Sequence, residues 1–495
     1  MTGHDVYLLS PEISLVGLAL LVMALDLFVE RKGILPLVAV VGLALPVALS
    51  IVLWNDVHSE VDGELVGVFG ALTVDKFALF FKFLVLGISA LVLTASVDYA
   101  RRLPRLQGEF LGLILLSATG MMLLAATTEL ITIYVSLELT TLPLIALSTF
   151  LMTPRSSEAG LKFLILSGIS SALLLYGIVL VYGLAGSTYL VDIAEVVKEP
   201  LDPDLAFGSY ALLVGIILIV AGFGFKISSV PFQMWVPDVY EGAPTPVVAF
   251  LSVASKAAGF AILLRVFYVA FPALEVDWAL LFAVLAAISM TLGNLVAMVQ
   301  SNIKRLLGYS TIAHAGYMMV GLAAVASRIE NGGEAAGPSS LLFYLGAYAA
   351  TNLTAFFAII AISNKIGSHK IDDFAGMGRR APVLAGVLSL ALISLIGIPP
   401  TGLFIGKIFL FTAAVQSDLV WLAAVGVVNS VLSAYYYLRV VRVMYMTEPT
   451  SEEKVPSSVP FRLALGVSAL AVLVIGVAPR LLTWVTDVAA LPLMP

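Results

Sequence analysis

The stretch GFGFKISSVPFQMWVPDVYEGAPTPVVAFLSVASK, residues 222–256, decides the fold. It joins the end of one long apolar run to the start of the next, and a lysine lies inside each run, at Lys226 and Lys256. A lysine inside a membrane-spanning helix is energetically costly and therefore marks an ion or proton path. Gly222 and Gly224 precede the first lysine and predict a helix that breaks at depth, which is tolerated only where protein or water lines the break.

The composition indicates a polytopic membrane protein. Of the 495 residues, 60% are hydrophobic and only 12% are charged, which is too apolar for a soluble globular domain. The net charge of −6 argues against a nucleic-acid partner. The chain has no cysteine and only four histidines, so iron–sulfur ligation, thiolate zinc sites and a haem held by paired histidines are not expected. Redox or nucleotide chemistry is therefore expected in other chains.

Apolar runs long enough to cross a bilayer, each roughly 20 residues, recur along the whole chain. The pattern predicts an all-α membrane protein of about fourteen transmembrane helices. The predicted spans are 13–29, 34–54, 73–97, 110–126, 130–151, 161–184, 210–228, 246–271, 278–299, 306–326, 341–362, 383–415, 419–445 and 461–477.

Lysine and arginine are unevenly distributed over the predicted loops. If the N-terminus is non-cytoplasmic, most of them fall in cytoplasmic loops, namely Arg31, Lys32, Arg101, Arg102, Arg105, Arg155, Lys304, Arg305, Lys365, Lys370, Arg379, Arg380, Arg442 and Lys454. The opposite loops keep mainly Lys198, Arg328 and Arg480. Because cytoplasmic loops are rich in these residues, both termini are expected on the non-cytoplasmic side.

A second interruption lies in the twelfth predicted span, SLIGIPPTGLFIGKIFLF, residues 394–411. Pro399 and Pro400 remove two backbone donors in mid-span, and Lys407 follows at depth. The seventh predicted span (210–228) and the twelfth (383–415) are therefore each interrupted beside a lysine. Because they are five spans apart, an odd number, they cross the membrane in opposite directions. This predicts two inverted five-helix repeats. Residues 1–107 hold helices one to three, 108–271 helices four to eight, 272–446 helices nine to thirteen, and 447–495 the last helix.

The candidate site residues are Glu138, Lys226, Lys256, Lys407 and His314, all inside apolar runs. A carboxylate at the depth of Glu138 needs a proton or a cationic partner, for which Lys226 is the natural candidate. Together these groups predict a line of titratable side chains joined by water, which suits protons better than a metal ion, since lysines repel metals.

Other interpretations of the same residues stay open. A Glu–Lys pair can be purely structural, the lysines can snorkel or bind a small anion, and His314 can simply bond a facing helix. Lys82 and Arg265 lie nearer helix ends, where snorkelling to the interface is expected.

Three stretches resemble a known family. KISSVPFQMWVPDVYEGAPTPVVAFLSVASK (226–256), NIKRLLGYSTIAHAGY (302–317) and GIPPTGLFIGKIFLF (397–411) are similar to the antiporter-like membrane subunits of respiratory complex I, a NADH–quinone oxidoreductase. The wording VYEGAPTPV followed by a lysine in helix eight is most similar to the N-type members. The resemblance covers essentially the full length.

The resemblance implies a proton-translocating subunit of a bacterial inner membrane without a redox centre of its own. NADH, FMN, iron–sulfur clusters and quinone would belong to partner subunits, and M-, K- and J-type membrane subunits would be neighbours. Glu138 and Lys226 match the charge pair that controls proton uptake, Lys256 the central lysine, Lys407 the exit lysine and His314 the helix-ten motif. The family often has histidine where this chain has Gln233, which weakens the loop as a proton entry point.

Two rival interpretations remain at this point. The same family recurs in Mrp-type cation/proton antiporters and membrane-bound hydrogenases. In that case the chain would have the same fold but belong to a different complex. A standalone secondary transporter of an organic solute would instead need a solute-sized polar pocket at the midplane. The electron donor, the quinone species and the proton stoichiometry do not follow from the sequence.

Overall fold

A computed structural model describes residues 2–29, 32–59, 63–100, 106–198, 206–325, 336–448 and 458–493. Within them the chain is almost entirely helical, because a backbone in lipid must satisfy its own hydrogen bonds. The orientation residues Arg31, Arg101, Arg102, Arg105, Arg328 and Lys454 lie outside the described residues.

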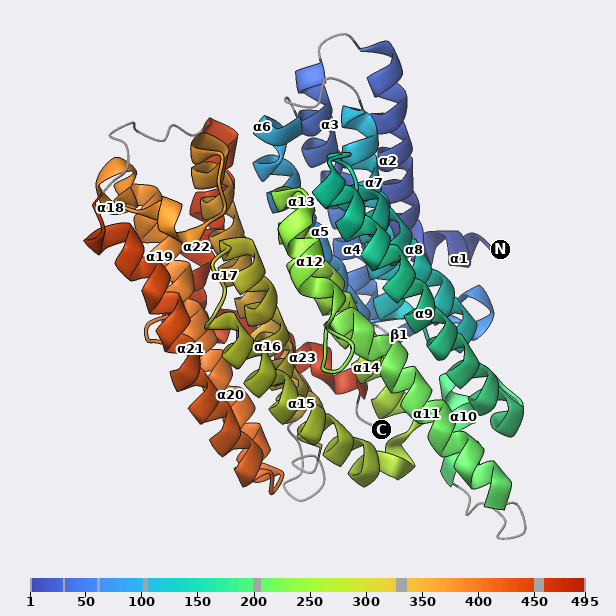
Figure 1. Ribbon diagram of the computed structural model, residues 1–495. Coiled ribbons are helices and arrows are strands. Elements are labelled where there is room, and N and C mark those ends of the chain that lie inside the picture. Colours follow the sequence, from blue (N-terminus) through green and yellow to red (C-terminus); the bar gives the residue numbers. More distant parts are fainter. Residues whose placement is uncertain are drawn as a thin grey trace.

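The helices pack side by side as one tilted bundle (Figure 1). The N-terminal part comprises α1 (Gly3–Leu8), α2 (Ser10–Phe28), η1 (Lys32–Ile34), α3 (Leu35–Gly42), α4 (Ala44–Ser59), β1 (Glu64–Gly67), η2 (Val68–Gly70), β2 (Leu72–Asp75), α5 (Lys76–Ala95) and α6 (Val97–Ala100). The two strands form an antiparallel hairpin in which Glu64 lies opposite Asp75.

The middle part contains α7 (Gln107–Ala126), α8 (Leu130–Ser148), α9 (Pro154–Ala185), α10 (Leu190–Lys198), α11 (Ala206–Ile227), α12 (Trp235–Gly242), α13 (Thr245–Phe250), the π-helical turn η4 (Leu251–Ser255) and α14 (Lys256–Ala270). The remainder contains η5 (Pro272–Leu274), α15 (Glu275–Ala297), α16 (Ile303–Ala323), α17 (Ala336–Ile366), η7 (Ile371–Phe374), α18 (Met377–Arg380), α19 (Pro382–Ile396), α20 (Gly402–Gln416), α21 (Val420–Met446), α22 (Val459–Val477), α23 (Arg480–Ala490) and η8 (Leu491–Leu493).

Among the described residues, 12 helical segments are long and apolar enough to cross a membrane. They account for all predicted spans except two. The predicted span 306–326 is the 21-residue helix α16, which is not among the 12, and the span 383–415 is divided into the shorter helices α19 and α20. The prediction of a multi-spanning helical membrane protein is therefore confirmed.

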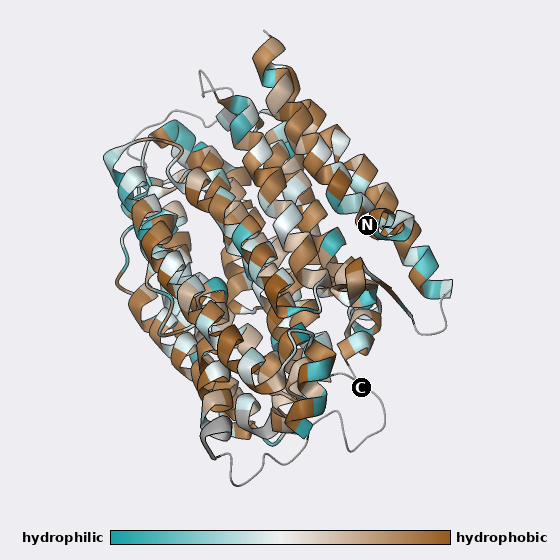
Figure 2. Ribbon diagram, turned by 90° about the vertical axis from the view of Figure 1, so that its right-hand side faces the viewer, coloured by the Kyte–Doolittle hydropathy of each residue, from teal (hydrophilic) through white to brown (hydrophobic). Residues whose placement is uncertain are grey.

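Burial follows the place of each helix in the bundle. The segment from Thr245 to Ala270 is almost entirely buried, whereas most residues of the segment from Leu35 to Ser59 are partly or fully exposed. Hydrophobic residues cover the length of the helices (Figure 2), as a surface in contact with lipid requires. This buried segment carries the candidate residue Lys256.

The chain breaks at both predicted places. α11 ends at Ile227 and α12 begins at Trp235, while α19 ends at Ile396 and α20 begins at Gly402. At the second break Gly397 has a φ of +90°, and a Cβ there would lie 2.9 Å from a carbon of the Lys407 side chain. Only glycine combines that conformation with that closeness.

Candidate functional site

The Lys256 side chain reaches the end of the broken helix α11. Its ammonium donates to the carbonyl of Ile227, the last residue of α11, at 2.9 Å, and to the carbonyl of Thr311 in α16 at 2.9 Å. The last carbonyls of a helix have no intrahelical partner and carry partial negative charge. The break in α11 therefore provides the oxygen that stabilises this buried charge.

Lys407 repeats this arrangement at the second break. Its ammonium donates to the carbonyl of Ile396, the last residue of α19, at 2.8 Å, to the carbonyl of Leu395 at 3.4 Å and to the hydroxyl of Ser430 at 3.0 Å. Its nitrogen also lies 4.3 Å from the centre of the Tyr317 ring, a cation–π contact. No carboxylate in the described part of the chain forms an ion pair with either Lys256 or Lys407.

The predicted partnership of Glu138 and Lys226 is not direct in this structure. The ammonium of Lys226, which is 8% exposed, donates to the hydroxyl of Thr141, and Glu138 accepts a hydrogen bond from the hydroxyl of Ser171. No ion pair within 4 Å joins the two, although both belong to the described residues.

His314 lies among tyrosines. Its Nδ1 is hydrogen-bonded to the hydroxyl of Tyr344 at 2.7 Å and its Nε2 to that of Tyr437 at 3.4 Å. Nearby, the hydroxyls of Thr311 and Tyr348 are 3.0 Å apart. These tyrosines were missed by the sequence analysis, which weighed charged and amide residues only. A hydropathy pattern treats a tyrosine as part of the packing, so its spacing does not reveal the hydroxyl network.

The predictions for Lys82 and Arg265 are wrong, because neither snorkels. Lys82 is 1% exposed and its ammonium lies 2.9 Å from a carboxylate oxygen of Glu12. Arg265 donates to both oxygens of Asp75, at 2.6 and 3.0 Å, and to the carbonyl of Ala125 at 2.9 Å. Asp75 is also the N-cap of α5, the helix that carries Lys82, so one carboxylate holds both Arg265 and the start of that helix.

A cluster of charged side chains joins α9, α12 and α16. Arg305 donates to Asp238 at 2.8 Å and to Glu241 at 3.1 Å, and Lys162 donates to Asp238 at 2.8 Å. Although burial favours its protonated form, the hydrogen bonds from Lys162 and Arg305 hold the pKa of Asp238 below its ordinary value. These side chains, with Arg155, line a small cavity of about 150 Å³. Between α11 and α12, the side-chain oxygen of Gln233 has no hydrogen-bond partner among the described residues.

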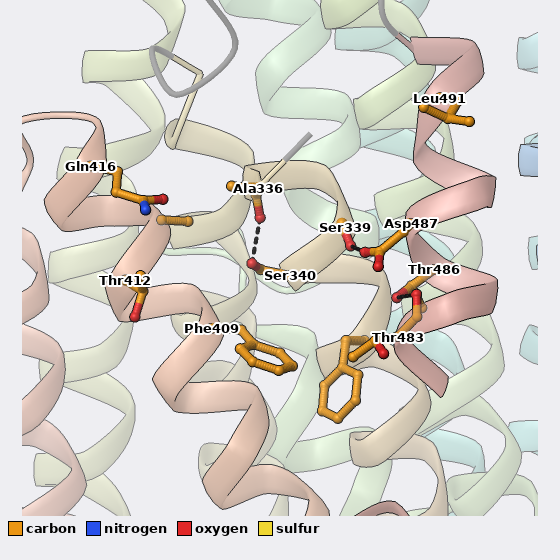
Figure 3. A pocket seen from close by; sticks show the side chains of 12 residues that line it. Ala336, Ser339, Ser340, Phe409, Thr412, Gln416, Thr483, Thr486, Asp487 and Leu491 are labelled. Carbon is orange, nitrogen blue, oxygen red and sulfur yellow. Dashed lines mark hydrogen bonds between the residues drawn. The ribbon is translucent and has the colours of Figure 1, made fainter. Parts of the chain in front are cut away.

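A larger cavity of about 330 Å³ lies between α17, α20 and α23 (Figure 3). It is lined by hydroxyls and by Asp487, which accepts a hydrogen bond from Ser339. Its lining residues on α20 include Phe409, Thr412 and Gln416. At about 3.6 residues per turn, they lie on the face of α20 opposite Lys407. This cavity is therefore separate from the lysine line.

No group of three or more His, Asp or Glu side chains suited to a metal ion occurs in the ranges that the structure describes. The polar groups converge instead on lysine ammonium groups, hydroxyls and carbonyls. Such an arrangement can bind, hold and release protons.

Comparisons with known proteins agree on one family. The family model described as NADH:quinone oxidoreductase/Mrp antiporter, transmembrane, matches residues 127–433. NADH-quinone oxidoreductase subunit N of Dehalococcoides mccartyi is 46% identical over 96% of this chain and 97% of that protein.

Solved structures have the same fold. A chain of respiratory complex I from Thermus thermophilus with bound aureothin is 30% identical, with a TM-score of 0.79 over 97% of this chain and 99% of that one. A chain of the Mrp complex from Dietzia has a TM-score of 0.84 at 20% identity, over 100% of this chain and 98% of that one. At that identity the likeness shows the fold alone.

Proposed function

The chain belongs to the NADH:quinone oxidoreductase/Mrp antiporter membrane family, and we propose that it is an N-type membrane subunit of a proton-pumping NADH–quinone oxidoreductase. The observation that carries this proposal is the pair of lysines, Lys256 and Lys407, each held at the end of a broken helix by neutral oxygens. A cation without a carboxylate partner can give up its proton without leaving a buried negative charge behind.

The proposed path runs through the candidate residues in order. Glu138 and Lys226 control uptake, Lys256 holds the proton at the centre, His314 lies between the lysines, and Lys407 releases the proton. Water fills the gaps between these groups. Quinone reduction in other subunits drives the cycle by electrostatic and conformational change, since this chain has no cysteine for an iron–sulfur cluster.

The proposed topology has fourteen crossings, with α16 and the α19–α20 pair each counted as one. Residues 108–271 and 272–446 form two inverted repeats, between residues 1–107 and 447–495. Both termini face the non-cytoplasmic side of a bacterial inner membrane, and protons leave the cytoplasm. M-, K- and J-type subunits are the proposed neighbours, and NADH, FMN, iron–sulfur clusters and quinone belong to partner subunits.

Replacing Lys226 with alanine in the intact assembly tests this proposal. Electron transfer to quinone and proton pumping into sealed vesicles are followed together. We expect both to be lost while the complex still assembles. The matched control is Lys198→Ala, which removes an exposed lysine of α10. Normal pumping in the Lys226 variant would make that lysine structural and overturn the proposal. Pumping by the isolated chain without electron transfer would favour a standalone transporter, and cation exchange by an assembly without quinone reduction an Mrp-type antiporter.

A further inference from the structure

The contacts of Lys407 restrict how a proton can reach it. A neutral lysine amine accepts a proton only from a group that has one to donate. Two of the three oxygens that contact Lys407 are the backbone carbonyls of Leu395 and Ile396, which only accept. The third is the hydroxyl of Ser430 at 3.0 Å. Ser430 is therefore the one proton donor among the described groups in hydrogen-bond contact with Lys407.

Ser430 has a second hydroxyl beside it. Its oxygen lies 3.2 Å from the hydroxyl of Tyr317, and it also donates to the carbonyl of Gly426 at 3.0 Å. Tyr317 is 1% exposed, and its ring faces the Lys407 ammonium. The Tyr317 ring thus stabilises the positive charge of Lys407.

Of these two residues, Tyr317 is the neighbour of His314. The rings of His314 and Tyr317 have centres 5.6 Å apart, on successive turns of α16. No hydrogen bond between described residues joins Tyr317 to the group formed by His314, Tyr344 and Tyr437. A bridging water is needed at that one step.

We propose that Tyr317 and Ser430 are relay residues that deliver the proton to Lys407, an inference that rests on the proposed function. Ser430 gives its hydroxyl proton to the Lys407 amine, which becomes an ammonium. Ser430 takes a proton from the hydroxyl of Tyr317, and Tyr317 takes one from the water on the His314 side. That water is restored by the proton that His314 gives up, so His314 ends the step neutral. Each hydroxyl ends the step neutral and reoriented, so one proton moves and no charge remains on either oxygen.

The test compares variants in the assembled complex, with the rate of proton pumping and the rate of quinone reduction as the readouts. Tyr317→Phe and Ser430→Ala each remove one hydroxyl, and Ser430→Thr restores it. We expect the first two to slow pumping by about tenfold, equivalent to about 1.4 kcal/mol in the barrier, and Ser430→Thr to recover most of the rate. The slowed variants should also show a larger ratio of rates in H₂O and D₂O, which a packing defect would not produce.

The controls are Tyr268→Phe and Ser468→Ala, buried residues of α14 and α22 whose hydroxyls bond the carbonyls of Leu322 and Leu465. Both should pump normally. Lys407→Met separates the two proposals. If it blocks pumping while Tyr317→Phe and Ser430→Ala pump at the normal rate, the relay is wrong and the proposed function stands. If Lys407→Met itself pumps normally, the proposed path is wrong. Tyr317→Phe is nearly isosteric and gives an answer even if a Ser430 variant fails to assemble.

Discussion

Arg265 and Lys256 belong to the same helix, α14, yet their surroundings differ in kind. Arg265 is held by the carboxylate of Asp75 through two hydrogen bonds and by one carbonyl. Lys256 is held by two carbonyls alone. A cation locked to a carboxylate loses its proton only by leaving that carboxylate unpaired, whereas a cation among neutral oxygens can lose it and stay satisfied. We propose that this difference separates a structural charge from an exchangeable one.

The same contrast recurs between Lys82 and Lys407. Lys82 is paired with Glu12 at 2.9 Å, and Lys407 contacts carbonyls and a hydroxyl. We call the pairs Asp75–Arg265 and Glu12–Lys82 the fixed pairs, and Lys256 and Lys407 the exchangeable lysines. The depth of a charge in the bundle therefore does not reveal its role, but its partners do.

The largest effect is expected when a fixed pair is broken. Arg265→Ala leaves the carboxylate of Asp75 buried without a cation, which costs about 3–5 kcal/mol. The amount of subunit in the assembled complex should fall sharply in membranes from this variant. The double variant Asp75→Asn with Arg265→Leu removes both charges and should recover most of the assembly. Full assembly of Arg265→Ala alone would contradict the division into fixed and exchangeable charges.

Loss of an exchangeable lysine should instead spare assembly and stop transport. Lys256→Met retains the apolar stem and removes the proton-binding group, and no carboxylate in the described part of the chain loses a partner by it. We expect pumping to fall by more than about tenfold, or about 1.4 kcal/mol in the barrier, at normal subunit abundance. The measurement is proton uptake by sealed vesicles beside an immunoblot of the complex, with Lys198→Met as the control.

An intermediate effect should follow if an exchangeable lysine is converted into a fixed one. Ser430→Asp places a carboxylate beside Lys407, and a hydrogen bond to a charged group is worth about 1.5–3 kcal/mol. Ser430→Asn has the same size without the charge, and both variants remove the relay hydroxyl. The proton on Lys407 should be held too tightly only in Ser430→Asp, so its pumping should fall several-fold below that of Ser430→Asn. Equal rates for both variants would show that the lost hydroxyl or crowding, and not the ion pair, is responsible.

The smallest effect concerns a histidine outside the spans. Burial, with help from Lys304 and Arg155, lowers the pKa of His369 to about 4. An unfolded histidine titrates near 6.5, so between about pH 6.5 and 4 the unfolded chain binds more protons and the folded state loses stability as the pH falls. His369→Gln should therefore flatten the dependence of the unfolding temperature on pH from 7 to 5. An unchanged slope would show that His369 is not the group responsible.

The sequence singled out Lys256 and Lys407 as candidates, whose role stays a prediction, but misjudged Lys82 and Arg265, for a physical reason. Lys407 is marked by the glycine and prolines just before it, which break its helix locally, and Lys256 by its place inside an apolar run. The partner of Arg265 is Asp75, 190 residues away, and no local pattern joins them. A basic residue near a helix end then favours snorkelling, which is the wrong outcome here.

The hydroxyl groups that contact the candidate residues could not be predicted from the sequence, for a related reason. Thr141, Ser171 and Ser430 are ordinary residues of apolar helices, where serine and threonine usually bond their own backbone. Their roles depend on which neighbouring helix they face. The sequence thus named the candidate lysines, whose part in proton transfer stays a prediction, but not the side chains that contact them.

The seat of Lys256 has a mechanical consequence. Its ammonium bonds α11 through Ile227 and α16 through Thr311 while belonging to α14, so it is a cross-link among three helices. A neutral amine has one donor fewer and a weaker dipole, and the cross-link loosens when the proton departs. Conversely, any movement of the end of α11 changes the energy of the charge. If Lys256 exchanges its proton as proposed, its protonation and the relative position of α11, α14 and α16 are therefore coupled.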